Sequence, residues 1–419
     1  MKKKAVKGSL GAIALASAMT MSMGTPVFAE YSNEYSTEIG GTKTTTFDKY
    51  LVMDKQAEVP NASFTYAVTA GTAKAYDVAG KKFAVLAGVD ADKVTMAGVG
   101  TKTANTITYK QGDATLNDEN KLVKDYYKET DKYAKKTATL DFSACRFTEP
   151  GIYRYIVTES GTNQAVTNDA DATRVVDVYV NDASGEGENK LEIAGYVLHS
   201  NADDAPDVSL GENHGSAGSY VATKSQGFTN SYDTSDILIE KKVSGNQASR
   251  DKYFEFTVKI TDAVPGTVYD VDLSYADATT KTNAATITAN EGKTNPATLT
   301  VGADGTVTQK FYLAHRQSIT IQGVAKDSKY KVTENAEDYK STSFDAIGAD
   351  ADNRVSEGSA DATSGTVASK DIYTGYLNTR DGVIPTGVIM TVAPFAAVTL
   401  LGGAGAVTMV MKKKKSEEE

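Results

Sequence analysis

The stretch Tyr153-Arg154-Tyr155-Ile156-Val157-Thr158-Glu159 has an aromatic or aliphatic side chain at every second position and ends on a glutamate in the same phase. Such alternation is typical of a β-strand with one buried face. Residues 30–381 contain many short runs of this kind, separated by Gly, Asn and Asp, and no long stretch with helical periodicity. The pattern predicts an all-β chain of antiparallel sandwiches. For a Lys- and Tyr-rich stretch near 117–136 we expect instead a short surface helix or an ordered loop.

Three short motifs occur twice in the same order, which indicates two tandem domains at 30–233 and 234–382. The first motif is an apolar strand that carries a lysine, the second is Tyr-x-Val-Thr-Glu, and the third is an aromatic residue two positions before an asparagine. In chain order within each domain they are Thr45–Leu51, Tyr155–Glu159 and Phe228–Asn230, then Ile237–Val243, Tyr330–Glu334 and Tyr376–Asn378.

Each predicted domain therefore has a lysine, a glutamate and an asparagine in phase with apolar strand neighbours, so that all three side chains should face the core. They are Lys49, Glu159 and Asn230 in the first domain, and Lys241, Glu334 and Asn378 in the second. Lys242 is a weaker candidate than Lys241 because its phase points outward. Buried charges are costly unless they are paired or neutralised, so these groups should interact.

Two interpretations of these triads remain open. In the first, they are buried Lys–Glu ion pairs with an asparagine nearby, or strand-end residues that reach solvent. In the second, burial favours a neutral amine, which attacks the asparagine carboxamide. Burial also raises the pKa of the glutamate, so that a protonated glutamate can hydrogen-bond the asparagine carbonyl and shuttle protons as ammonia leaves. The product is a Lys–Asn isopeptide bond.

The first 29 residues have the features of a secretory signal peptide. Four lysines lie within the first seven positions, an apolar run follows from Leu10 to Met23, and Val27-Phe28-Ala29 is a small-residue cleavage site. We therefore expect the chain to be secreted.

The other end, residues 383–419, combines the motif Val383-Ile384-Pro385-Thr386-Gly387, an uncharged run over 388–411 that is long enough to span a bilayer, and four lysines at 412–415. A plain C-terminal anchor helix would explain the last two parts alone. With the motif, the arrangement resembles a sortase sorting signal. That resemblance implies that a sortase cysteine attacks the Thr386 carbonyl, releases Gly387 onward, and passes Thr386 to an amine.

Composition narrows the classes of function. The net charge is −10, and removing the two ends takes away eight lysines but only three glutamates, so the remainder is more acidic still. An acidic surface disfavours nucleic acid and anionic lipid as partners. The lone Cys145 cannot form an internal disulfide, and the three histidines are scattered. We expect no metal, no cofactor and no multiple-turnover enzyme.

Taken together, the residues resemble those of Gram-positive, sortase-assembled backbone pilins of the streptococcal T-antigen type, built from pilin isopeptide-linkage domains. The resemblance is carried by the segments Ser63–Tyr66, Phe147–Tyr153, Val157–Glu159, Phe228–Asn230, Lys241–Gly245, Val332–Glu334 and Val383–Gly387. It implies two immunoglobulin-like (Cna-type) sandwiches. Each would hold a Lys–Asn isopeptide bond made with a catalytic glutamate, Glu159 or Glu334.

The same resemblance implies a covalent polymer on the cell-wall surface. Sortase would join Thr386 of one subunit to a lysine of the next, and Lys224 occupies the corresponding neighbourhood, one residue nearer to Phe228 than in the family pattern. The implied partners are sortase, other copies of the chain, peptidoglycan, minor pilins and a host ligand. The alternative is a singly wall-anchored adhesin of the same fold. The first domain is longer than usual between about 70 and 136, and the sequence assigns no role to this insertion.

Overall fold

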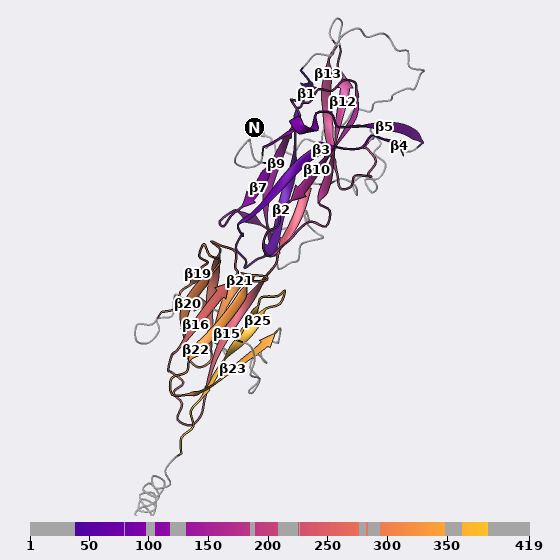
Figure 1. Cartoon of the computed structure of the whole chain (residues 1–419). Coiled ribbons are helices and arrows are strands. Elements are labelled where there is room, and N and C mark those ends of the chain that lie inside the picture. The colour runs from indigo at the N-terminus through magenta and orange to yellow at the C-terminus, as the bar shows by residue number, and fades with distance from the viewer. Residues whose placement is uncertain are drawn as a thin grey trace, which may run out of the picture.

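The computed structural model describes residues 38–78, 80–97, 105–117, 131–184, 189–207, 225, 227–275, 282–283, 294–347 and 363–383. In these ranges the chain is built from strands and one short 3-10 helix, η1 (Ala91–Lys93), with no α-helix. The predicted all-β fold is therefore confirmed. Figure 1 shows two sandwiches arranged end to end.

The first sandwich consists of two sheets. Its eight-stranded sheet has the order β1 (Gly40–Gly41), β13 (Leu191–His199), β12 (Thr173–Asp182), β10 (Gly151–Ser160), β3 (Ala62–Ala70) and β7 (Thr106–Tyr109). In addition, β5 (Lys81–Ala87) pairs with β10, and β4 (Lys74–Val78) pairs with β5. Its six-stranded sheet has the order β11 (Val166–Thr167), β14 (Gly227–Tyr232), β2 (Thr44–Asp54), β9 (Asp131–Asp141) and β6 (Thr95–Ala97), with β8 (Thr115–Leu116) beside β9.

The second sandwich repeats this plan. Its seven-stranded sheet has the order β18 (Thr282–Asn283), β17 (Val268–Tyr275), β21 (Gln317–Ala325), β15 (Thr234–Ser244), β25 (Ile372–Thr379) and β23 (Lys340–Ile347), with β19 (Thr298–Thr300) beside β17. The facing sheet has the order β20 (Val307–Leu313), β16 (Phe254–Thr261), β22 (Lys329–Asn335) and β24 (Ser364–Thr366).

In both sandwiches the first and last strands are parallel neighbours in the same sheet. β14 pairs with β2, and β25 pairs with β15. Gly227 permits the first of these pairings, because its φ is +147° and an added Cβ would lie 1.7 Å from the backbone oxygen of Asp48. A larger residue there would push β14 away from β2.

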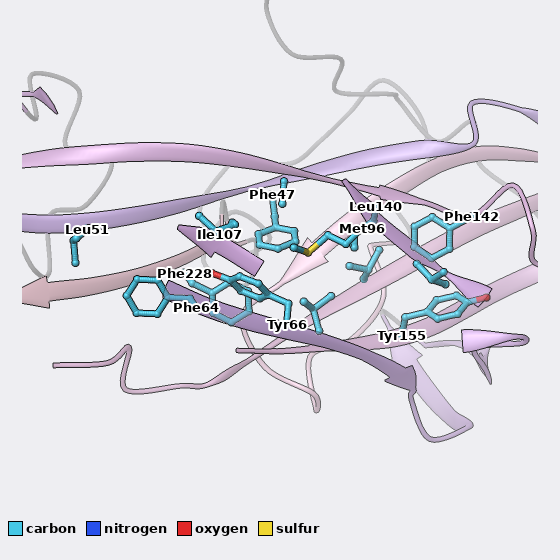
Figure 2. Close-up of a cluster of buried hydrophobic side chains, with 14 of the residues drawn as sticks. Phe47, Leu51, Phe64, Tyr66, Met96, Ile107, Leu140, Phe142, Tyr155 and Phe228 are labelled. Carbon is cyan, nitrogen blue, oxygen red and sulfur yellow. The ribbon is translucent and has the colours of Figure 1, made fainter. Parts of the chain in front are cut away.

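Strand phase places the apolar residues as the sequence pattern predicts. Phe47, Leu51 and Met53 of β2 enter the core of the first sandwich together with Phe228 of β14 and Tyr66 of β3. Figure 2 shows Phe47, Tyr66 and Phe228 close together, with ring centroids 5.2–5.6 Å apart. The opposite face of β2 is also buried, where Tyr50 and Val52 form a small cluster with Tyr133.

One local prediction was wrong. Residues 131–136, for which we expected a helix or a loop, begin the long strand β9, which pairs with β2 along its whole length. Pairing with a central strand overrides the low β-propensity of lysine, since Lys132, Lys135 and Lys136 can direct their charged ends toward solvent or acidic partners. Lys135 and Lys136 do so at Asp48 and Asp113.

Only Asp233 separates the last strand of the first sandwich from the first strand of the second. Its N–H donates to Ala165 O, and its carbonyl accepts the N–H of Lys326. Val264 and Ala325 of the second sandwich also join the core cluster of the first. The junction is thus short and packed, so a force applied to one sandwich passes directly to the other.

Candidate functional site

Lys49 lies in the middle of β2 with its side chain in the core, and the residue is 0% exposed. Its Nζ is 2.8 Å from Oε1 and 2.7 Å from Oε2 of Glu159, which reaches it from β10 in the facing sheet. The ring of Phe64 lies beneath the amine, with 4.3 Å between Nζ and the ring centroid. Burial lowers the pKa of Lys49 to about 8, against the opposing effect of the Glu159 charge.

Asn230 of β14 completes the first triad. Its Nδ2 donates to Glu159 Oε1 at 2.8 Å, and the residue is 0% exposed. Its register partner on β2 is Leu51, whereas Phe228 lies opposite Lys49. The aromatic residue of the motif lies opposite the lysine. The asparagine, two positions later, is therefore the next residue along the same face of the sheet.

The orientation of the Asn230 carboxamide differs from the sequence-based hypothesis. We expected the glutamate to hydrogen-bond the carbonyl oxygen, but the glutamate faces the amide nitrogen. The carbonyl oxygen Oδ1 instead accepts the backbone N–H of Asp169 at 2.9 Å. A backbone N–H can only donate, so the atom facing it must be the oxygen.

Sequence reasoning missed Tyr66. Its hydroxyl donates to Glu159 Oε2 at 2.6 Å, and Tyr66 is the register partner of Glu159 on β3. Burial and the neighbouring carboxylate raise the pKa of Tyr66, so it remains a proton donor. The alternation of Phe64 and Tyr66 already placed both on the core face, but only the pairing of β3 with β10 directs the hydroxyl to the glutamate.

The second sandwich holds an equivalent triad. Lys241 of β15 contacts Glu334 Oε1 of β22, and both side chains are 0% exposed. Asn378 of β25 donates its Nδ2 to the same oxygen at 3.2 Å. Desolvation by burial lowers the pKa of Lys241 to about 8, with Glu334 again opposing the shift. Lys241 lies opposite Tyr376 and Val243 lies opposite Asn378, which is the same register offset as in the first sandwich.

The two sites differ in what surrounds the glutamate. The register partner of Glu334 is Phe256, which occupies the place that Tyr66 has beside Glu159. Phenylalanine has no hydroxyl, and Ser341 of β23 donates to Glu334 Oε2 at 3.0 Å instead. The ring centroid of Phe254 lies 4.3 Å from Lys241 Nζ, the same distance as between the Phe64 ring centroid and Lys49 Nζ. The two sites thus share the amine, the carboxyl group, the carboxamide and the phenylalanine ring beside the amine.

Such an arrangement has a defined chemical capacity. An amine, a carboxyl group that can carry a proton, and a carboxamide are held in contact and shielded from water. Holding the reacting groups in contact removes a large part of the entropic cost that the same reaction between separate molecules would carry. A static ion pair would use the same contacts but would keep the mass of the unmodified chain, whereas a condensation would release ammonia.

The other predicted site residues lie outside the described residues: Lys224, Thr386, Gly387, the signal peptide and the apolar run after 387. Among the residues that the structure describes, no helix has the length and apolar character needed to cross a membrane. Within those same ranges, no group of three or more His, Cys, Asp or Glu side chains could hold a metal ion.

Comparison with known proteins follows the division into two sandwiches. Residues 58–233 match the family model of the Spy0128-like isopeptide containing domain, and residues 235–380 match a domain of unknown function, DUF7601. A curated protein named "Pilin" from Streptococcus pyogenes serotype M1 is 26% identical over 391 residues, which is 92% of this chain and 95% of that protein.

Solved structures give similar matches. The crystal structure of the major pilin from Streptococcus pyogenes covers 82% of this chain and 100% of its own, at 20% identity and a TM-score of 0.48. The major pilin T3.2 from the same species covers 81% and 100%, at 21% identity and a TM-score of 0.45. The family and sequence matches confirm the resemblance to pilins with isopeptide-containing domains.

Proposed function

We propose that this chain is the polymerising subunit of a sortase-assembled pilus and that each sandwich is cross-linked by a self-formed Lys–Asn isopeptide bond. The observation that carries the proposal is the convergence, in both sandwiches, of a buried lysine, glutamate and asparagine with the same strand register. The pilin relative supports the pilus role. The reaction occurs once per site, so the chain is not an enzyme in the usual sense.

The bond-forming step is a condensation that balances without any further reactant. A proton moves from the Lys49 ammonium to the Glu159 carboxylate, and the free amine attacks Cγ of Asn230. Glu159 then returns that proton to Nδ2 and takes a second proton from Nζ. The Cγ–Nδ2 bond breaks and ammonia leaves, so that the Nζ–Cγ amide remains beside a protonated Glu159. Lys241, Glu334 and Asn378 would follow the same course. The lowered pKa of each lysine reduces the cost of forming the amine.

For the external linkages we propose that sortase cleaves between Thr386 and Gly387 and joins Thr386 to Lys224 of the next subunit. The last subunit is then transferred to peptidoglycan, and the apolar run after Gly387 retains the precursor in the membrane until cleavage. Lys224 precedes β14 by three residues. A bond at Lys224 would therefore enter the subunit beside the strand that carries Asn230.

The internal bonds are tested by intact mass. The full secreted chain from cells that lack sortase should be lighter than its sequence by about two ammonia, roughly 17 Da for each condensation. Glu159→Ala should lose only one ammonia, because the second triad shares no residue with the first. Fragmentation should then find the Lys241–Asn378 link and no link at Lys49. A parent chain at its full sequence mass would reject the isopeptide bonds and favour static ion pairs.

The external linkage is tested by immunoblot of cell-wall extracts boiled in detergent. The parent should give a ladder of covalent polymers, and Lys224→Ala should collapse it to monomer because the acceptor amine is gone. Lys242→Ala is a matched control, since Lys242 is a partly exposed lysine outside the Lys241 triad. A single wall-linked band in the parent would contradict polymerisation and favour the singly anchored adhesin.

A further inference from the structure

The loop between β11 and β12 contacts the carboxamide that would react in the first sandwich. The backbone N–H of Asp169 donates to Asn230 Oδ1 at 2.9 Å. On the other side, Nδ2 donates to Glu159 Oε1 at 2.8 Å and to Asn168 Oδ1 at 3.2 Å. The carboxamide is therefore held with its oxygen toward the Asp169 N–H and its nitrogen toward Glu159, the group that transfers protons in the proposed reaction.

The side chain of Asp169 fixes the position of its own backbone N–H. Its Oδ2 accepts the N–H of Thr229 at 2.8 Å and Nη2 of Arg174 at 2.6 Å, and its Oδ1 accepts the N–H of Asp171 at 3.1 Å. Thr229 directly precedes Asn230 in β14, so the carboxylate ties the loop to the strand that carries the electrophile. Asp169 is 9% exposed and Arg174 is 8% exposed.

Arg174 contacts both the β11–β12 loop and strand β14, which Asp169 joins. Its Nε donates to Gly227 O of β14 at 2.8 Å, and its Nη1 donates to Asp171 O of the loop at 2.8 Å. A buried Asp–Arg pair is expensive to desolvate and is not needed for stability alone, so a second role is reasonable. Here contacts of the pair link the β11–β12 loop to Gly227 and Thr229 of β14, the strand that carries Asn230.

We propose that the backbone N–H of Asp169 is the oxyanion donor of the first isopeptide site, and that the Asp169 carboxylate and Arg174 are the groups that position it. The inference rests on the proposed isopeptide function and adds to it a residue outside the Lys–Glu–Asn triad.

The chemistry assigns this N–H a definite task. When the Lys49 amine attacks Cγ, the carbonyl π electrons move to Oδ1, which becomes negatively charged in the tetrahedral intermediate. Glu159 cannot stabilise that charge in the observed geometry, because its oxygen faces Nδ2. The Asp169 N–H faces Oδ1 and needs no reorganisation to do so. As Nδ2 leaves with a proton from Glu159, the electrons return from Oδ1 and the donor is left facing the new amide oxygen.

The experiment follows bond formation in time in the full chain. Cells receive a pulse of isotopically heavy lysine, samples are quenched in acidic urea, and digestion quantifies the linked peptides Lys49–Asn230 and Lys241–Asn378. Asp169→Ala removes the carboxylate that fixes the donor and should slow the first link about 10- to 100-fold. This is less than the roughly 100- to 1,000-fold loss for a removed oxyanion donor, because the N–H is displaced and not deleted. Asp169→Asn keeps an oxygen for the Thr229 N–H and should lie near the parent. The second link, in the same molecules, should keep its rate.

Arg174→Met separates positioning from a simple charge effect. The Asp169 charge raises the pKa of Lys49 and the Arg174 charge lowers it. Suppose that these residues acted only by changing the pKa of Lys49. Asp169→Ala would then favour the free amine and Arg174→Met would disfavour it, so the first link would form faster in one variant and more slowly in the other. Positioning predicts that both variants slow the first link, and that the double variant is no slower than the worse single variant.

Arg154→Met is the matched control for lost stability. Arg154 forms a buried bidentate pair with Asp177 in the same sandwich, at 2.7 Å for both contacts, and touches no member of the triad. It should leave the rate of the first link unchanged. Equal slowing by Arg154→Met, opposite effects of the Asp169 and Arg174 variants, or no slowing by either would overturn the assignment of the donor. Absence of both links in the parent would instead defeat the isopeptide proposal itself.

Discussion

A single parent subunit pulled from its two ends should extend very little. The Asn378→Ala variant should lengthen by roughly 450 Å when its second sandwich unfolds, because each released residue adds ~3.5 Å of extended chain. Because β25 lies beside β15, a Lys241–Asn378 bond leaves residues 242–377 outside the loaded path. With both bonds present the force would pass along 38–49, 230–241 and 378–383 only. Optical tweezers with handles attached at both ends of the described chain measure this length directly.

The companion variants calibrate the measurement. Asn230→Ala should release residues 50–229 and give the longer step, roughly 600 Å at the same length per residue. The double variant should give both steps. Lys242→Ala is the control, since Lys242 is a partly exposed neighbour of Lys241 on β15 and belongs to no proposed cross-link. Steps of these lengths in the parent chain would show that neither bond carries the load.

The second large effect is expected for Glu159→Ala, which should leave the first sandwich close to unfolded. Without the glutamate no bond forms, and the entropy model used for disulfides assigns about 5 kcal/mol to a cross-link that closes so long a loop. The variant also leaves Lys49 buried without its carboxylate, and breaking a buried pair costs about 3–5 kcal/mol more. The sum approaches the whole stability of an ordinary domain, about 5–15 kcal/mol. Peptide-resolved hydrogen exchange in denaturant measures each sandwich separately.

Asn230→Ala separates the two contributions to this loss. It removes the bond but keeps the contact between Lys49 and Glu159, so the first sandwich should lose about 5 kcal/mol and remain folded. The second sandwich should keep its exchange protection in both variants. Equal protection of Glu159→Ala and the parent would mean that neither the bond nor the pair stabilises the fold.

The fold class, the repeat and the inward phase of six polar residues could be read from the amino-acid sequence alone. Each of these is a local property. Side-chain alternation follows from strand geometry, so the phase of Lys49 relative to Phe47 and Leu51 was readable before any partner was known. The sorting-signal motif is local in the same sense, because a sortase would read a short segment rather than a surface.

How the triad groups contact one another, and which further groups join them, depends on the fold. Glu159 reaches Lys49 across the sandwich, Tyr66 reaches Glu159 through the pairing of β3 with β10, and Asp169 reaches Asn230 from a loop 61 residues earlier. Strand phase gives the face of a residue but neither its neighbour in the sheet nor the register that aligns them. The orientation of the Asn230 carboxamide depends on that alignment, since a single backbone N–H from the β11–β12 loop determines which of its two ends faces the glutamate.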